Sequence, residues 1–307
     1  MRNFIIDTDT ASDDAVAIVM ALRQPDIDVK AITVVAGNAP LPQAVQNALY
    51  TVELCGADTP VYAGCAKPLL RDLETAQDVH GRDGMGDIGL PLQGRTAAAG
   101  HAADTLRALI NAHAGDITLV TLGPLTNVAL ALLREPELAR CVSHCWIMGG
   151  IGSGHGNVTP TAEFNIWVDP EAAKIVYESG MNMTMVGWDI SWKYATFDAD
   201  QAAEIRGIGT PLAEFVIDIQ ATLTEFSMTE NALPGFDLPD PITMAAAIDP
   251  SIAEYRDYRV DVTTGNGLER GITVVDVLGV TKRAPQMRVA TSADRAAFVN
   301  MLKRSVS

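Results

Sequence analysis

The segment Phe4-Ile5-Ile6-Asp7-Thr8-Asp9-Thr10-Ala11-Ser12-Asp13-Asp14 decides the fold of this chain. Its first three residues are apolar and predict a short buried strand. From residue 13 to residue 23, apolar residues recur at helical spacing, and the pattern ends before Pro25. The chain therefore opens with a buried strand, an acidic turn and a helix, which together make one βα unit.

The same alternation continues toward the C-terminus. Further strands are expected at residues 29–35, 61–63, 117–122, 145–148 and 182–187, and helices at residues 42–54, 101–113, 125–133 and 170–179. Strands that alternate with crossover helices predict an α/β fold, an open, mostly parallel, Rossmann-like sheet with helices on both faces. Such sheets bind ligands beyond the carboxyl ends of their strands, so the polar clusters that follow these strands should meet at that edge.

The last third of the chain has a different pattern. From residue 198 it is mostly helical, then strands are expected at residues 258–262, 271–275 and 286–289, and a final helix follows. Length alone allows one large domain or two modest ones. Because no linker, low-complexity tract or internal repeat interrupts the sequence, we expect residues 1–307 to form a single domain.

Composition excludes several classes of function. The net charge of −16 argues against binding to nucleic acid. No stretch of ~18 apolar residues predicts a membrane span. The N-terminus lacks the apolar run of a secretory signal, so we expect a cytoplasmic protein. Its four cysteines (Cys55, Cys65, Cys141 and Cys145) do not form two pairs at zinc-finger spacing, and we interpret them as reduced core residues.

The opening segment also concentrates negative charge. Asp7 and Asp9 leave the strand on one side, and Asp13 and Asp14 begin the helix. One or two acids at a helix start are explained by capping and by the helix dipole. Four carboxylates in so small a space repel one another unless a cation lies among them. The cluster therefore predicts a site for a hard cation, Ca²⁺ or Mg²⁺.

With these residues the chain resembles the inosine–uridine-preferring nucleoside hydrolase family. The family pattern Asp-x-Asp-x-x-x-Asp-Asp stands here at residues 7–14, and six further segments follow in order. They are Val35-Ala36-Gly37-Asn38, Val79-His80-Gly81-Arg82-Asp83-Gly84, Leu122-Gly123-Pro124-Leu125-Thr126-Asn127, Met148-Gly149-Gly150, Ala162-Glu163-Phe164-Asn165 with Asp169-Pro170-Glu171-Ala172-Ala173, and Asp240-Pro241. The similarity covers essentially the whole chain.

The resemblance implies hydrolysis of the N-glycosidic bond of ribonucleosides to ribose and free base, in salvage. It implies that Ca²⁺ is bound by Asp9, Asp14, Asp240 and the backbone carbonyl of Leu122, with Asp9 also acting as the general base that activates the water. A metal-bound water with a nearby carboxylate suits this reaction, which passes through an oxocarbenium-like ribose. Homodimers or homotetramers are common in the family and are expected here.

The resemblance also assigns the rest of the pocket. Asp13 and Asn165 are expected to bind the ribose hydroxyls, and Asn157 and Glu163 the 5′-hydroxyl end. Asn38 would orient the ribose or the leaving base, while Met148, Phe164 and His80 would line the pocket. Trp188, after a predicted strand, is a candidate for stacking on the base, although ordinary packing explains it equally well. The same two interpretations hold for Trp192, Phe226 and Phe236.

One position departs from the family pattern. Many members have a histidine directly before the late aspartate, assigned as the acid that protonates the departing base, and this chain has Pro239 there. Activation of the base must therefore differ. Two alternatives to an active hydrolase stay open: a nucleoside- or ribose-binding protein with weak catalysis, and a phosphatase of the haloacid dehalogenase type. The phosphatase motif also begins Asp-x-Asp, but it gives Asp13 and Asp14 no role.

Overall fold

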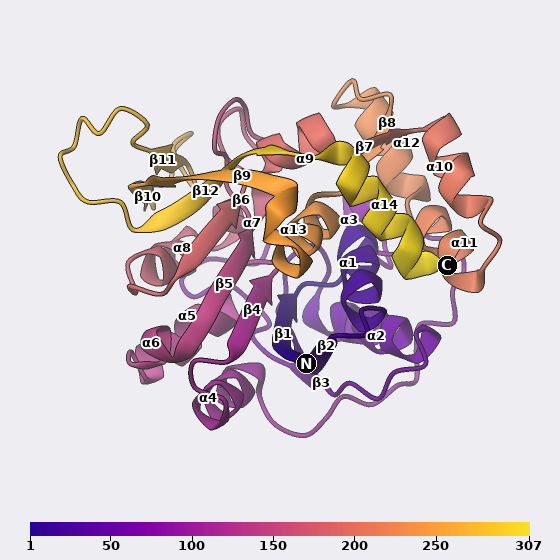
Figure 1. Cartoon of the computed structure of the whole chain (residues 1–307), viewed down its shortest axis with the longest axis horizontal. Coiled ribbons are helices and arrows are strands. Elements are labelled where there is room, and N and C mark those ends of the chain that lie inside the picture. Colours follow the sequence, from indigo (N-terminus) through magenta and orange to yellow (C-terminus); the bar gives the residue numbers. More distant parts are fainter.

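The computed structural model describes residues 1–307 and is built around one eight-stranded sheet (Figure 1). In sheet order the strands are β3 (Val61–Ala63), β2 (Ile27–Val34), β1 (Arg2–Thr8), β4 (Ile117–Thr121), β5 (Val142–Met148), β6 (Met183–Val186), β12 (Met287–Ala293) and β9 (Ala253–Tyr258). All neighbours are parallel except β12 and β9, which are antiparallel. This confirms the predicted mostly parallel α/β sheet.

Strand β1 lies near the middle of the sheet because it is apolar enough to be covered on both faces. It pairs with β2 and with β4 in parallel, and residues 4–8 are buried. Near its carboxyl end, Asp7 is level with Thr33 on one side and Thr121 on the other. The turn that carries the four aspartates therefore starts at the carboxyl edge of the sheet, as the sequence predicts.

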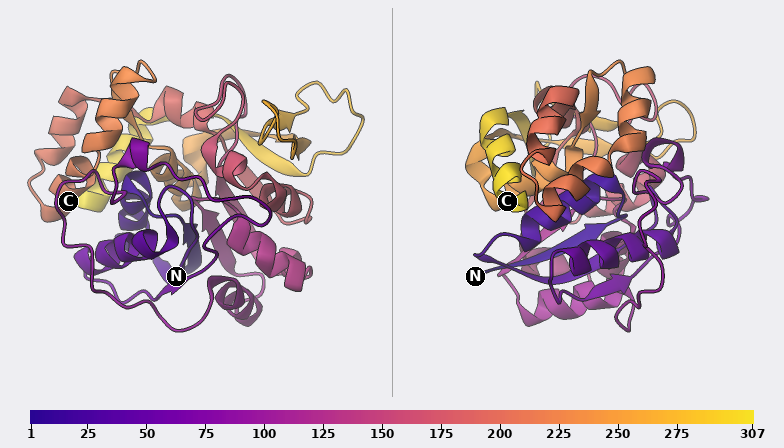
Figure 2. Two further views of the ribbon diagram at one scale, coloured as in Figure 1. Left: turned by 180° about the vertical axis from the view of Figure 1, so that it is seen from behind. Right: turned by 90° about the vertical axis from the view of Figure 1, so that its right-hand side faces the viewer.

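Helices cover the sheet on both faces, and each face has its own apolar core (Figure 2). On one face lie α1 (Ser12–Leu22), α2 (Leu41–Leu54), α13 (Pro239–Ile248) and α14 (Arg295–Val306). On the other lie α4 (Ala102–Ala112), α5 (Thr126–Arg134), α6 (Leu138–Cys141) and α8 (Pro170–Tyr177).

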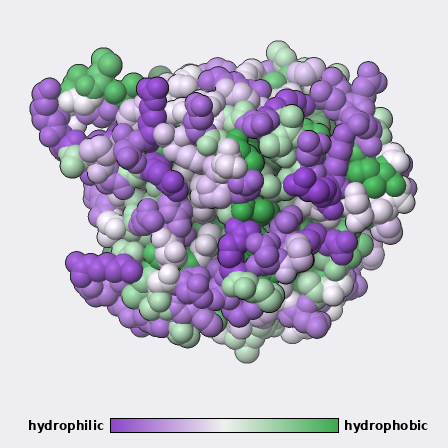
Figure 3. Space-filling model, in the orientation of Figure 1, coloured by the Kyte–Doolittle hydropathy of each residue, from purple (hydrophilic) through white to green (hydrophobic).

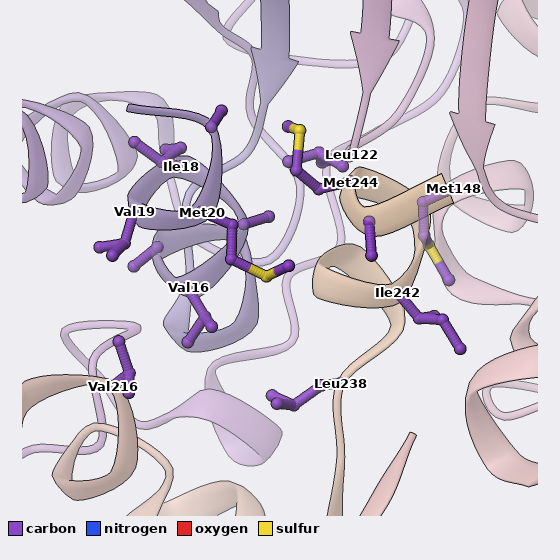
Figure 4. Packing of buried hydrophobic residues seen from close by; sticks show 14 of the residues in the cluster. Val16, Ile18, Val19, Met20, Leu122, Met148, Val216, Leu238, Ile242 and Met244 are labelled. Atoms are coloured by element: carbon purple, nitrogen blue, oxygen red, sulfur yellow. The ribbon is translucent and has the colours of Figure 1, made fainter. Parts of the chain in front are cut away.

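Helix α1 is buried on nearly all sides, which its run of alanine, valine, isoleucine and methionine allows. It packs against α13, so the first and last parts of the site come from two contacting helices. Figure 4 shows Val16 and Met20 of α1 facing the same apolar cluster as Ile242 and Met244 of α13. This packing fixes the start of α1, with Asp13 and Asp14, relative to the start of α13, with Asp240.

A further layer of short elements surrounds the carboxyl edge. It contains α3 (Gln77–His80), α7 (Phe164–Val168), α9 (Trp188–Tyr194), α10 (Ala199–Arg206), α11 (Pro211–Asp218) and α12 (Ala221–Thr229), with the small antiparallel sheet of β7 (Thr196–Asp198) and β8 (Gly235–Asp237). The sequence did not predict α3, α6, α7, α9, β7 or β8. They are three to seven residues long, too short for a periodic pattern to identify.

Two smaller expectations need correction. The predicted strand at residues 258–262 is divided: residue 258 ends β9, and β10 (Val260–Val262) pairs with β11 (Thr273–Val275) outside the main sheet. The four cysteines are indeed unpaired, but only Cys145 is buried. Cys55 and Cys141, at the ends of α2 and α6, and Cys65, in the loop after β3, are half-buried.

An arm projects from the body where β10 and β11 meet the loop of residues 276–286 (Figure 1). Several of its apolar side chains are exposed (Figure 3): Leu268, Val277, Leu278 and Val280. The short helix η1 (Pro250–Ile252) precedes β9. None of the helices is both long and apolar enough to cross a bilayer.

Candidate active site

A cavity of about 360 Å³ opens beyond the carboxyl ends of β4 and β5. Its wall brings together eleven of the residues predicted from the sequence: Asp13, Asn38, His80, Leu122, Met148, Asn157, Glu163, Phe164, Asn165, Trp188 and Asp240. The two remaining predicted residues, Asp9 and Asp14, do not line the cavity and are completely buried.

The carboxylates at the floor of this cavity are tightly grouped. One oxygen each of Asp13, Asp14 and Asp240 lies within 4.8 Å of the other two, and all three side chains are buried. Asp9 is outside this group, although its charge raises the pKa of Asp240. We use the name carboxylate floor for Asp9, Asp13, Asp14 and Asp240.

Hydrogen bonds fix two members of the carboxylate floor. Asp9 Oδ2 accepts from the backbone N–H of Asn38 at 2.6 Å. Asp14 accepts from the hydroxyl of Thr8 at 2.5 Å and from the backbone N–H of Ala11 at 2.9 Å. Loop and turn groups at the ends of β1 and β2 therefore set the orientation of both carboxylates.

Three oxygens of the carboxylate floor are buried with no hydrogen-bond partner: Asp9 Oδ1, Asp13 Oδ1 and Asp240 Oδ2. Burial, and then the charge of Asp14, raises the pKa of both Asp9 and Asp240 well above the usual range. Burial also raises the pKa of Asp13 to about 7. A cation bound among these carboxylates would supply the missing partner and favour their ionised forms.

Two glycines make room for Asp9. A Cβ atom at Gly37 would lie 2.1 Å from Asp9 Oδ2, and one at Gly123 would lie 2.6 Å from Asp9 Oδ1. Neither glycine has a positive φ, so space and not backbone conformation requires the absence of a side chain. The loops after β2 and β4 thus close directly on this carboxylate.

Leu122 lines the cavity, and its backbone carbonyl accepts a hydrogen bond from Asn165 Nδ2 at 2.7 Å. The same amide lies 3.2 Å from the sulfur of Met148. A carbonyl oxygen has a second lone pair, so this contact leaves it able to accept another ligand. Asn165 therefore joins the ends of β4 and β5 at the wall of the cavity.

Glu163 organises the loop that follows β5. It caps α7 by accepting from the backbone N–H groups of Asn165 and Ile166, and it also accepts from Gly150 N–H at 2.8 Å. Burial raises its pKa to about 7. Asn157, which is exposed, accepts from the N–H of Phe164 at 3.0 Å, so both residues of the predicted 5′-hydroxyl site touch the start of α7.

His80 is buried at the end of α3, with Nδ1 3.0 Å from the hydroxyl of Ser12. Burial lowers its pKa to about 4, so the ring is neutral at neutral pH. Its 3.9 Å approach to Asp13 is therefore not an ion pair under those conditions. The prediction that His80 lies at the pocket and not in the core agrees with its place on the cavity wall.

Comparison with known proteins identifies the family of this chain. The family model for inosine-uridine preferring nucleoside hydrolase matches residues 4–300. This chain belongs to that family. The pyrimidine-specific ribonucleoside hydrolase RihA of Salmonella paratyphi C (strain RKS4594) is 39% identical over 300 residues, which cover 97% of this chain and 96% of the relative.

Solved nucleoside hydrolases have the same fold. A plant nucleoside hydrolase superposes with a TM-score of 0.93 at 33% identity, covering 100% of this chain and 99% of its own. A purine-preferring ribonucleoside hydrolase from Gardnerella vaginalis gives a TM-score of 0.92 at 31% identity, covering 99% and 98%. The chain is therefore a ribonucleoside hydrolase, an N-glycosyl hydrolase, and its membership decides against the phosphatase alternative.

The hydrolase cavity also contains residues that the sequence did not predict. Leu223, Ser227 and Asn231 of α12 and the residues after it lie on the wall, as does Asp237 of β8. Phe226 of α12, which the sequence offered as a stacking candidate, lies beside them on the wall. The sequence placed α12 only in a generally helical region. Asp237 lies three residues before Asp240, and that spacing was the only local signal that could have identified it.

Trp188 and Asp237 are neighbours on the wall of the cavity. Trp188 is buried at the start of α9, with its ring centroid 5.1 Å from that of Trp192. Asp237 accepts a hydrogen bond from the hydroxyl of Ser191. Burial raises the pKa of Asp237 to about 6, and the neighbouring Ser191 and Trp188 side chains oppose the rise.

Proposed function

We propose that this hydrolase acts with a Ca²⁺ ion held by Asp9, Asp14, Asp240 and the backbone carbonyl of Leu122. The observation that carries the proposal is the set of three partnerless buried oxygens, on Asp9, Asp13 and Asp240. Buried anions require a cation or a proton, and an all-oxygen donor set suits a hard divalent cation such as Ca²⁺. The residues present therefore fit the metal that the family resemblance implies.

Such an ion, when bound, lowers the pKa of a coordinated water and fixes neighbouring sugar hydroxyls. The chain's own part begins with Asp9, which acts as the general base and accepts the proton of the attacking water. Its Oδ2 is held by the N–H of Asn38, which leaves Oδ1 free for that proton. The surrounding carboxylates favour the positive charge that develops on the ribose ring.

The wall of the cavity positions the substrate. Asp13 and Asn165 bind the 2′- and 3′-hydroxyls of the ribose, and Glu163 and Asn157 hold the 5′-hydroxyl end. The carboxylate and amide groups here suit neutral hydroxyls. Proximity to the buried floor supports the ribose assignment, because Asp13 belongs to the floor and Asn165 contacts the Leu122 carbonyl.

The base occupies the other end of the cavity in this proposal, against Trp188, Met148, Phe164 and His80, with Asn38 at the junction between ribose and base. The relatives' names do not select one base class, since the Salmonella enzyme is called pyrimidine-specific and the Gardnerella enzyme purine-preferring. An assay must therefore include both classes.

The test is release of free ribose from inosine, adenosine, guanosine, uridine and cytidine, with and without chelator, beside an Asp9→Asn control. We expect release that stops with chelator, returns with Ca²⁺ and is lost in Asp9→Asn. A Ca²⁺-dependent rise in Tm of the parent, measured separately, reports binding without turnover. Release that survives chelation or the Asp9 substitution would contradict the proposed metal and base.

A further inference from the structure

Helix α7 and its cap residue Glu163 supply proposed contacts to the ribose, yet this helix is too short to be stable alone. It has five residues, and isolated helices of fewer than ~12 residues are marginal in water. Glu163 caps its N-terminal end by accepting from two backbone N–H groups. The carbonyl groups at a helix C-terminus have no partner within the helix, so that end of α7 needs donors from elsewhere in the chain.

Arg270 supplies these donors from the turn between β10 and β11. Its Nε donates to the carbonyl of Trp167 at 2.9 Å, and its Nη2 donates to the carbonyl of Val168 at 3.4 Å. The guanidinium carbon lies 3.6 Å from the centroid of the Trp167 ring, and Nη1 pairs with Glu74 at 2.9 Å. A cation at a helix C-terminus interacts favourably with the last carbonyls and with the helix dipole. Arg270 therefore caps α7 at the end opposite Glu163.

The residue after Arg270 brings the chain into direct contact with α7. A Cβ atom at Gly271 would lie 2.5 Å from the Cα atom of Trp167 and 2.9 Å from its nitrogen. The φ of +74° at Gly271 also favours glycine. Because the Arg270 side chain is only 13% exposed, the cap is mostly shielded from water, which strengthens its hydrogen bonds.

Thr273 holds the other segment that binds Glu163. Its buried hydroxyl accepts from the N–H of Ile151 at 2.8 Å and donates to the carbonyl of Ile151 at 2.9 Å. The neighbouring Gly150 donates its N–H to Glu163 Oε2 at 2.8 Å. The carboxyl group of Glu163 therefore takes its donors from two segments, α7 and the loop after β5, and residues 270–273 hold both of them.

Residues 270–273, which we call the brace, do not line the cavity. The brace contacts Trp167 directly and Glu163 through the two segments that it holds, and both of these residues are on the cavity wall. Asn165, the other proposed ribose ligand near α7, has a separate anchor in the carbonyl of Leu122. The brace should therefore matter most for the position of Glu163.

We infer that Arg270 is a positioning residue of this hydrolase, which sets the place of Glu163 by capping α7. The inference rests on the proposed function, in which Glu163 holds the 5′-hydroxyl end of the ribose, and it names a residue outside the cavity that controls this contact. Arg270 itself touches no substrate and forms or breaks no bond in the reaction. Its loss should therefore weaken the grip on the 5′-hydroxyl and leave the attacking water and its base in place.

The test compares each nucleoside with its 5′-deoxy analogue, uridine with 5′-deoxyuridine and inosine with 5′-deoxyinosine, by release of the sugar from the calcium-loaded enzyme. The parent should prefer the nucleoside with a 5′-hydroxyl by about tenfold or more in kcat/KM, because a site built to bind a hydroxyl disfavours an analogue without it. In Arg270→Gln most of this preference should disappear, whereas kcat/KM for the 5′-deoxy analogues should stay close to that of the parent. Arg270→Lys, which keeps the charge and a donor, should retain part of the preference.

Further variants separate this role from general stability. Thr273→Val removes the hydroxyl that binds Ile151 and should also lower the preference, while Thr273→Ser keeps the hydroxyl and should retain it. Arg283→Gln is the matched control, because it breaks an ion pair with Asp261 on the arm, away from α7. It should leave both the activity and the preference unchanged.

An Arg270→Gln variant that keeps the parent preference overturns the inference and leaves the proposed function intact. Equal losses for a nucleoside and its analogue, with a lowered Tm, give Arg270 a purely structural role and also overturn it. A parent that cleaves both members of each pair equally well contradicts the proposed role of Glu163, and the inference fails with it. A parent that cleaves none of the four compounds overturns the proposed hydrolysis itself.

Discussion

The two ends of the cavity differ in how they are built. The carboxylate floor takes three of its four acids from residues 7–14, and hydrogen bonds from Thr8, Ala11 and Asn38 hold two of them, Asp9 and Asp14. The opposite wall, where we propose that the base binds, takes Trp188, Phe226 and Asp237 from three elements, α9, α12 and β8. In the proposed function, a floor shared by all substrates is fixed by a local motif, whereas the wall that contacts the base is assembled from elements far apart in the sequence.

This contrast predicts that changes in the floor act on every substrate alike, and the largest effect should follow removal of Asp240. Asp240→Asn should lower kcat/KM for all cleaved nucleosides by about 10²–10³-fold, as for loss of a main electrostatic contact in an active site. Because the substitution removes one of several buried like charges, the variant should be more stable than the parent in chelator, and its Tm should no longer rise with Ca²⁺.

Paired ribose-release and thermal-unfolding measurements check this prediction. A variant that keeps the calcium-dependent rise in Tm would show that Asp240 is not a ligand. A loss of activity confined to one class of base would show that the floor is not common to all substrates.

A smaller effect is expected when the floor is displaced without loss of charge. In Gly123→Ala the new Cβ would meet Asp9 Oδ1 at 2.6 Å and the backbone nitrogen of Asp9 at 2.9 Å, so either the loop or the carboxylate must move. A displacement of about 1 Å at a reacting group can cost on the order of 10²-fold in rate. Steady-state kinetics with a purine and a pyrimidine nucleoside should show equal losses, and unequal losses would contradict the separation of the two ends.

At the base end, substitutions should change selectivity more than rate. Phe226 is a half-buried wall residue of α12, and Phe226→Ala should raise KM about 3–10-fold, the equivalent of one aromatic contact of ~0.5–1.5 kcal/mol. We expect kcat to change little and the rise to differ among bases. A uniform fall of kcat would place this residue with the catalytic groups. Met228→Ala, exposed and off the cavity wall, is the matched control on the same helix.

The smallest effect concerns stability away from both ends. His144 of β5 is half-buried beside Arg288, and burial, followed by the charge of Arg288, lowers its pKa to about 4. An unfolded histidine titrates near pH 6.5. Between these values the unfolded chain binds the extra proton, so this contribution is complete above about pH 6.5 and is lost as the pH falls toward 4.

After allowance for partial exposure, the loss should be about 1–2 kcal/mol. Denaturant unfolding gives the free energy of unfolding of the parent and of His144→Gln at pH 7 and at pH 5. The contribution of His144 is the difference between the two proteins in how much this free energy changes with pH. Equal changes in the two proteins would contradict the lowered pKa. The comparison with the variant is needed because Asp7, whose pKa is raised to about 7 by burial, has the opposite pH dependence.

The sequence predicted the central sheet and the floor for a common physical reason, which is that both depend on local patterns. A run such as Phe4-Ile5-Ile6 indicates a buried strand, and Asp13 and Asp14 directly after it can only lie at the carboxyl edge. Asp237 was not predicted because nothing around it in the sequence differs from an ordinary short strand, and the sequence offered Phe226 only as one of several aromatic residues that stacking or packing explains equally well. Their place on the wall depends on how α12 and β8 pack.

The roles of Asp9, Asp14 and the other predicted residues, the single-domain organisation, the oligomeric state and the cytoplasmic location stay predictions. Cys55, Cys65 and Cys141 show the limit of composition, since a residue type that is usually buried becomes half-exposed when it falls at the end of an element or in a loop.

The packing of α13 against α1 has a consequence for biosynthesis. Asp14 and Asp240 are more than two hundred residues apart, so most of the chain is synthesised after Asp14 and before Asp240. Until α13 is synthesised, the apolar residues of α1 that pack against it remain exposed. The carboxylate floor also lacks Asp240 until then. Long-range contacts of this kind form late, and truncated chains expose apolar surface. A fragment that stops before Pro239 would therefore be a target for chaperones, and it could not be a partly active enzyme.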